Sequence, residues 1–335
     1  MTRPRQTDNN TTCQNLHCRY HLKEKDKNII KHGKNRAGHQ IYKCLHCNTY
    51  FTQTKNTPLY QKHLTEPQIT NICKHLVEKN GIRSIERLTG HHRDTIGNLL
   101  EDMAEHASEV NNYFMKDLGL SQYECDEIWT FIKKKEKTLK RAGTFEPESG
   151  DCYLYTAVKR NSYLFAAFSA GKWTQQTCLD MVRKLAKALK RPSLQCPLEV
   201  FTDGNDDYCY ILPLCFQLGF VDYGQLIKIK RNGRWVVGKK RLVIYGEPSL
   251  GDIETTDVEN FNSVLRERLG RLVRESKCLS KVKRRLVCAV ELFKFYWNFI
   301  NEFKRNVSPA KLEGLTDHLW SWHEFFYYQS LSNLS

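Results

Sequence analysis

The spacing of the apolar positions changes along the chain, and each spacing predicts a different kind of structure. Between residues 59 and 115 they recur every three or four positions, the helical period, with breaks at Asn80-Gly81 and Gly90. We expect one helix before Asn80, a short one at 83–89 and a third from His92. Their inward positions are Ile69, Ile72, Cys73, Leu76 and Val77, then Ile96, Leu99, Leu100, Met103 and Ala107.

This succession predicts a helix-turn-helix at 59–115, with Gly90 in the turn. His92, Arg93 and Asn98 would face outward at the start of the third helix, where side chains can read the edges of DNA bases. An ordinary helical bundle has the same periodicity, so the pattern alone leaves both interpretations open.

From residue 116 to 305 strand and helix patterns alternate. Strands are predicted at 123–132, 153–159, 163–169 and 198–201, and a helix at 174–189 that ends at Arg191-Pro192. Three strands, a helix, a strand and another helix is the order of an RNase H-like α/β domain, with a mixed sheet flanked by helices. Other α/β layouts also fit this order.

The segment 254–281 combines a helix start, a carboxylate and a basic face. Thr256 and Glu259 have the spacing of a capping box, and the apolar positions that follow are helical. Glu259, Asn262 and Arg266 would share one face of this helix. Glu259 could also do no more than cap its own helix. The apolar positions are Val258, Phe261, Leu265, Leu269 and Leu272, and the flanking cations are Arg268, Arg271 and Arg274.

A basic β-hairpin is predicted at 225–245, because Asn232-Gly233 interrupts two runs of alternating apolar residues. It could lie along a DNA backbone, or it could be a solvated basic hairpin. Its cations are Lys228, Lys230, Arg231, Arg234, Lys239, Lys240 and Arg241. The aromatic segment 282–303 predicts core packing or a subunit interface, and 306–335 a C-terminal tail.

The charge of the chain indicates a polyanionic partner. Its 335 residues carry a formal net charge of +15, with a pI near 9.2, and clustered cations gain affinity for phosphates by releasing counterions. Ribosomal or membrane-surface binding would suit this composition equally. The chain has neither an apolar run of membrane-spanning length nor a signal-peptide core, so we expect a cytoplasmic, nucleoid-associated protein without a membrane partner.

Four of the 13 cysteines form a pattern, and the other nine are scattered singly as in a reducing compartment. Paired thiolates on two tight turns can close a tetrahedral zinc site, so residues 1–58 predict a zinc ribbon with a structural Zn²⁺. The four ligands are Cys13, Cys18, Cys44 and Cys47, one of which could be replaced by His17, His21, His39 or His46.

Three carboxylates fall where the predicted α/β domain would bring them together. Asp126 lies within the first strand, Asp203 ends the fourth, and Glu259 lies on the late helix. In an RNase H-like sheet the first and fourth strands are neighbours, so Asp126 and Asp203 would meet over a metal pair. Glu127 would point to the opposite strand face, outside the cluster. Asp206 and Asp207 would cap a helix.

The residues around these acids carry a family resemblance. CDEIWTF contains Asp126, FTDGNDDY contains Asp203, and E-x-x-N-x-x-L-R begins at Glu259 and is followed by RL-x-R and C-x-S-K. The chain resembles transposases of the insertion sequence one family, which belong to the DDE class. The resemblance implies that Asp126, Asp203 and Glu259 hold two Mg²⁺ or Mn²⁺ ions, and that a zinc ribbon and a helix-turn-helix precede an RNase H-like catalytic domain.

The function expected from this resemblance is transposition. The chain would bind terminal inverted repeats as double-stranded DNA, cleave the strands, and join them to target DNA as a homo-oligomer in a synaptic complex. A metal-dependent nuclease of the same fold would use the same carboxylates, and a transposase-derived DNA-binding regulator would use none of them. Beside His92, Arg93 and Asn98, the predicted DNA contacts are Lys228, Lys230, Arg234, Asn262, Arg266, Arg271 and Arg274.

Overall fold

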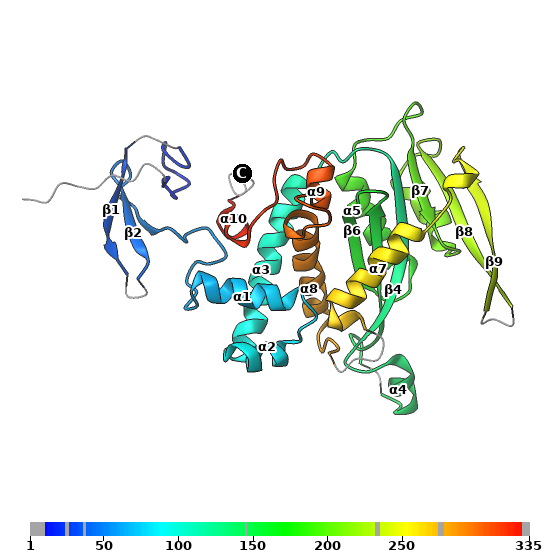
Figure 1. Cartoon of the computed structure of the whole chain (residues 1–335), viewed down its shortest axis with the longest axis horizontal. Helices are drawn as coiled ribbons and strands as arrows, with labels where there is room; N and C mark the ends of the chain where they lie inside the picture. Colours follow the sequence, from blue (N-terminus) through cyan, green and yellow to red (C-terminus); the bar gives the residue numbers. More distant parts are fainter. Residues whose placement is uncertain are drawn as a thin grey trace, which may run out of the picture. The chain divides into compact units, whose positions relative to one another are not determined.

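The protein is a mixed α/β chain that divides into two compact units. The computed structural model describes residues 11–23, 27–35, 38–144, 146–231, 235–273 and 278–329. One unit comprises Met1–Thr70 and Ser321–Ser335, and the other comprises Asn71–Trp320 (Figure 1). Among the described helices, none has the length and apolar character needed to cross a membrane.

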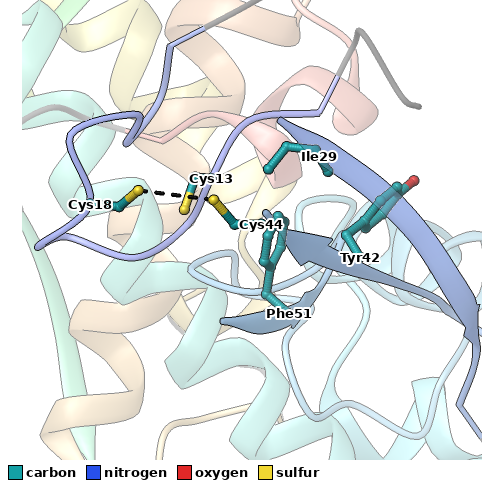
Figure 2. Packing of buried hydrophobic residues seen from close by; sticks show 6 residues of the cluster. All are labelled: Cys13, Cys18, Ile29, Tyr42, Cys44 and Phe51. Atoms are coloured by element: carbon teal, nitrogen blue, oxygen red, sulfur yellow. Dashed lines mark hydrogen bonds between the residues drawn. The ribbon is translucent and has the colours of Figure 1, made fainter. Parts of the chain in front are cut away.

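The smaller unit contains a three-stranded antiparallel sheet in the order β1 (Ile29–Lys34), β2 (Gln40–Cys44), β3 (Tyr50–Thr52). Its core is small: Ile29, Tyr42 and Phe51 pack against the buried cysteines (Figure 2). Helix α10 (Trp322–Tyr327) also belongs to this unit and starts with a capping box from Ser321 and Glu324. The segment predicted as a C-terminal tail therefore contributes a helix to the N-terminal unit.

The larger unit is built around a six-stranded mixed sheet in the order β6-β5-β4-β7-β8-β9. Strand β4 pairs in parallel with β7, and β7 with β8, whereas the other pairs are antiparallel. The strand bounds are β4 (Gln122–Ile132), β5 (Gly150–Lys159), β6 (Leu164–Gly171), β7 (Leu198–Thr202), β8 (Val221–Arg231) and β9 (Trp235–Tyr245). The strands and the two arms of the hairpin are confirmed, whereas the predicted Asn232-Gly233 turn lies outside the described residues.

Helices cover both faces of this sheet. Helix α7 (Thr256–Arg268) packs against β4 and β5, and Figure 1 shows it crossing the sheet beside β4. Helices α5 (Gln175–Ala188) and α6 (Asp207–Cys215) pack together on the opposite face, and α5 buries Cys178, Met181, Val182 and Leu185 there. The helix predicted at 174–189 is confirmed. The short elements of the unit are α4 (Glu136–Arg141), η1 (Leu250–Asp252), η2 (Gly270–Leu272) and α9 (Pro309–Leu312).

The helices predicted as a helix-turn-helix are α1 (Glu66–Leu76), α2 (Ile82–Thr89) and α3 (Arg93–Phe114). Helix α3 packs along α8 (Lys283–Phe295) within the larger unit, so the domain boundary predicted near residue 115 falls inside that unit. The aromatic segment continues as the π-helix η3 (Tyr296–Ile300). Phe293, Phe295 and Phe299 are fully buried, so this segment forms core.

Candidate active site

Two acids from neighbouring parallel strands meet at the end of β7. Cys125 of β4 pairs with Thr202 of β7, which places Asp126 beside the residue that follows that strand, Asp203. One carboxylate oxygen from each acid lies within 4.8 Å of the other, and Glu127 joins them within the same limit. The structure therefore brings Asp126 and Asp203 together and adds an acid that the sequence interpretation left out.

The prediction that Glu127 stays outside this cluster is wrong. Asp126 and Glu127 do leave β4 on opposite faces, as consecutive strand residues must. However, Asp203 lies in the loop just beyond the strand end, where neither face of the sheet separates it from the two side chains. Asn205 in the same loop donates a hydrogen bond from Nδ2 to Oε1 of Glu127 at 3.0 Å.

Asn262 of α7 orients Asp126. Its Nδ2 donates to Oδ2 of Asp126 at 2.8 Å, and its Oδ1 accepts from the Thr156 hydroxyl at 3.1 Å. Thr156 occupies the β5 position directly opposite Asp126. Because the Asn262 side chain is 1% exposed and engaged at both ends, its predicted DNA contact is corrected to a positioning role.

Glu259 is close to this group but bound to other partners. Lys228 of β8 donates from Nζ to Oε1 of Glu259 at 2.6 Å, and the Thr255 hydroxyl donates to the same oxygen at 3.0 Å. Asp126, Asp203 and Glu259 all contribute to the electrostatic environment of Lys228. Lys228 thus lies among all three predicted catalytic acids, although Glu259 is not one of the three acids clustered within 4.8 Å of one another.

The start of α7 is fixed by the sheet instead of by the predicted capping box. The N-cap is Thr255 and not Thr256, and its side chain makes no capping hydrogen bond. Glu124 of β4, 1% exposed, accepts from the backbone N–H of Val258 at 2.9 Å and from Arg160 at 2.8 Å. A carboxylate at a helix N-terminus accepts hydrogen bonds from the unpaired backbone N–H groups of the helix and interacts favourably with the positive end of the helix dipole. Glu124 therefore anchors the helix that carries Glu259.

The environment of the cluster disfavours its negative charges. Burial raises the pKa of Asp126 to about 6 and that of Glu127 to about 8, and the charge of Asp203 adds to each increase. Burial alone would raise the pKa of Glu259, but the hydrogen bond and charge of Lys228 lower it. Crowded acids that resist ionisation are a setting in which a divalent cation, whose charge offsets theirs, binds favourably.

The remaining DNA-contact candidates differ in exposure. His92, Arg93 and Asn98 are exposed at the start of α3, and Asp94 donates its backbone N–H to His92. Arg266 on α7 and Arg271 in η2 are both half-buried, and Arg271 donates to the Ser280 hydroxyl. Arg234, Arg274 and the side chain of Lys230 lie outside the described residues. At the start of α6, Asp206 occupies the N-cap position, but its side chain makes no capping hydrogen bond.

The smaller unit brings its four predicted zinc ligands together. The sulfur atoms of Cys13, Cys18, Cys44 and Cys47 lie within 4.8 Å of one another, with 3.7 Å between Cys13 and Cys47 and 3.9 Å between Cys18 and Cys44. Zn–S bonds of about 2.3 Å in a tetrahedral site place sulfurs about 3.8 Å apart. Figure 2 shows three of these cysteines beside the small apolar core. The four cysteines fit a zinc ion. Nδ1 of His46 lies 3.5 Å from the Cys18 sulfur, but His46 is not one of the four clustered ligands.

A scan against protein-family models and a search of curated proteins each found no match for this chain. A functional conclusion therefore depends on the geometry of its own residues and on the family resemblance of the three acidic segments.

Proposed function

We propose that this chain is a DDE transposase of the insertion sequence one type, which cleaves terminal inverted repeats and joins them to target DNA. The observation that carries the proposal is the meeting of Asp126 and Asp203, together with the position of Glu259 on a helix hydrogen-bonded to Asp126 through Asn262. Carboxylate oxygens in this number are the donors that Mg²⁺ and Mn²⁺ prefer.

The strand order supports an RNase H-like assignment for the larger unit. If β4 to β8 are counted as strands one to five, their order in the sheet is 3-2-1-4-5, with the first three antiparallel and the last two parallel to strand one. This is the neighbour relation between first and fourth strands that the sequence interpretation requires. The ninth strand, β9, extends the sheet at the hairpin edge.

The residues would divide the work of phosphoryl transfer between them. Asp126, Asp203 and Glu259 would hold the cations, Asn262 would fix the orientation of Asp126, and Glu124 would hold α7 in place. Bound Mg²⁺ or Mn²⁺ supplies the charge that stabilises the attacking and leaving oxygens of an in-line displacement. Lys228 would contribute positive charge beside the DNA phosphate, and Glu259 keeps it close to the acids.

A strand-joining assay with the full chain, the element's own terminal repeats and target DNA tests this function. With Mg²⁺ or Mn²⁺ we expect both cleavage and joining. Asp203→Asn should lower both rates by at least about a hundredfold, because one metal site serves both steps. Asp206→Asn removes a charge three residues away and should leave both rates unchanged.

Other outcomes would support the alternative functions. Cleavage without joining would favour a metal-dependent nuclease. DNA binding without either reaction would favour a regulator. Near-normal joining by Glu259→Gln would mean that Glu259 is no ligand, because Gln keeps the hydrogen bond from Thr255 and loses only the charge.

A further inference from the structure

Glu127 is the acid of the cluster that the proposed catalytic set leaves unused. It lies on β4 directly after Asp126, and its carboxylate reaches Asp126 and Asp203 from the other face of the strand. One of its oxygens, Oε1, is held by Asn205.

The loop that holds Glu127 is itself fixed by several contacts. The side-chain oxygen of Asn205 accepts a hydrogen bond from the backbone N–H of Asp207 at 3.1 Å. The backbone carbonyl of Asn205 accepts one from the side-chain amide of Gln225 at 3.2 Å. Asp203 also accepts the backbone N–H of Asn205 at 3.3 Å. One short loop therefore holds both Asp203 and the amide that orients Glu127, so the two carboxylates are positioned together.

Two tyrosines also surround Glu127 on its side of β4. Tyr155 occupies the β5 position directly opposite Glu127, and its ring lies 6.4 Å from the ring of Tyr208 on α6. Both side chains are fully buried; the Tyr208 hydroxyl hydrogen-bonds the Glu127 carboxylate, and the Tyr155 hydroxyl interacts with the side chain of Asn205. Together with Asn205, these groups fix the direction of the Glu127 side chain, as the outer partners of metal ligands do.

Glu259, the expected third ligand, is occupied elsewhere. Its Oε1 accepts from both Lys228 and Thr255, and it is not among the three acids whose oxygens lie within 4.8 Å. A carboxylate paired with an ammonium group at 2.6 Å is a poorer ligand until that pair separates. Glu127 has no such competing cation among its contacts in the described residues.

On this basis, we propose that Glu127 is a ligand of the divalent cation held by Asp126 and Asp203, reaching it from the opposite face of β4. The ligand class is a hard divalent cation such as Mg²⁺ or Mn²⁺, because the donors are carboxylate oxygens. This inference rests on the proposed function. It also predicts that one cation binds without DNA, with Asp126, Glu127 and Asp203 as its protein ligands.

The test measures binding of Mn²⁺ alone to the full-length, zinc-containing chain without DNA, by electron paramagnetic resonance of the unbound ion. Glu127→Gln keeps the acceptor for Asn205 and removes the charge, and we expect its Mn²⁺ affinity to fall at least about tenfold. Asp206→Asn is the matched control from the same loop, since Asp206 is not among the three clustered acids, and it should bind as the unaltered chain does. Glu259→Gln should weaken this binding less than Glu127→Gln does.

The outcomes separate this inference from the proposed function. Unchanged Mn²⁺ affinity in Glu127→Gln, with binding lost in Asp203→Asn, would overturn the role of Glu127 and leave the transposase proposal standing. Equal affinity in Asp203→Asn and the unaltered chain would overturn both. If Glu127→Gln fails to fold in a thermal melt, Glu127→Asp decides, since shortening the side chain withdraws its oxygen from the cluster and must also weaken binding.

Discussion

At the scale of single residues, Asp126 and Glu127 show how two neighbouring acids acquire different properties in one strand. Each accepts a hydrogen bond from an asparagine amide, but the charge of Lys228 favours the charged form of Asp126, whereas the charge of Asp126 disfavours that of Glu127. Their pKa values of about 6 and about 8 follow this difference. Both values lie above the usual range of a carboxyl group, mainly because of burial.

These shifts predict a pH dependence of cation binding. A cation binds the ionised carboxylate, so a raised pKa means that protons compete with the metal until the pH exceeds that pKa. We expect Mn²⁺ affinity to rise between the pKa values of about 6 and about 8, and to level off above them. Mn²⁺ titrations across this interval measure it. A constant affinity would show that neither acid must lose a proton on binding.

Sequence patterns predict which face of an element a side chain lies on, but they do not predict which residues it will contact. Helical spacing correctly put Asn262 on one face of its helix, but it contained no sign that this face packs against β4, so a buried positioning residue was interpreted as a DNA contact. Strand alternation correctly sent Glu127 to the opposite face. It could not reveal that Asp203 lies beyond the strand end, within reach of both faces.

At the scale of elements, regular periods located every strand and helix named in the sequence analysis of the larger unit. The same periods do not predict which groups cap the ends of the helices. The cap of α7 is Glu124, which is 134 residues from the N–H group it accepts, so no local pattern contains it. Thr256 and Glu259 have the spacing of a capping box by chance, while Thr255 bonds the Glu259 side chain one turn ahead.

The four-cysteine group, which fits a zinc ion, leads to a prediction about metal removal from the smaller unit. Its apolar core consists of Ile29, Tyr42 and Phe51 beside the cysteines, too little buried surface to offset the chain entropy of the segment. We expect the strong chelator EDTA, or Cys44→Ser, to release one zinc per chain and to unfold β1 to β3, as seen by loss of amide-exchange protection there.

The matched control is Cys73→Ser in the larger unit, a buried cysteine outside the four-sulfur group. It should retain zinc in native mass spectrometry, whatever it costs in stability. Full zinc content in Cys44→Ser would mean that three sulfurs, or His46, suffice to hold the ion.

At the scale of the whole molecule, the predicted boundaries between modules differ from the units of the structure. A C-terminal tail is predicted at 306–335, but α9 lies in the larger unit and α10 in the smaller one. Helix α3 has two distinct parts. Its start, with His92 and Arg93, is exposed, and the rest of the helix packs along α8. Such pairings depend on contacts between distant segments, which sequence spacing does not encode.

The net charge of +15 leads to the last prediction, which concerns DNA binding by the complete chain. Lys239 and Lys240 are exposed on β9. In the register of the β8–β9 hairpin, Lys239 lies opposite Lys228, which belongs to the candidate site. If this edge follows a DNA backbone, the double variant Lys239→Gln with Lys240→Gln should bind terminal-repeat duplex more weakly. Its plot of log affinity against log salt should be shallower by about 2, because each lost phosphate contact removes about 0.9 from the slope.

Two controls identify the source of such a change. Lys187→Gln with Lys190→Gln removes two exposed cations at the end of α5, on the sheet face opposite α7. This double variant should change the slope little. Asp203→Asn should bind DNA at least as well as the unaltered chain, because it removes a negative charge from a site that faces phosphates. Fluorescence anisotropy over a salt series measures all four proteins. Equal losses from both lysine pairs would mean that diffuse charge, and not the hairpin edge, attracts the DNA.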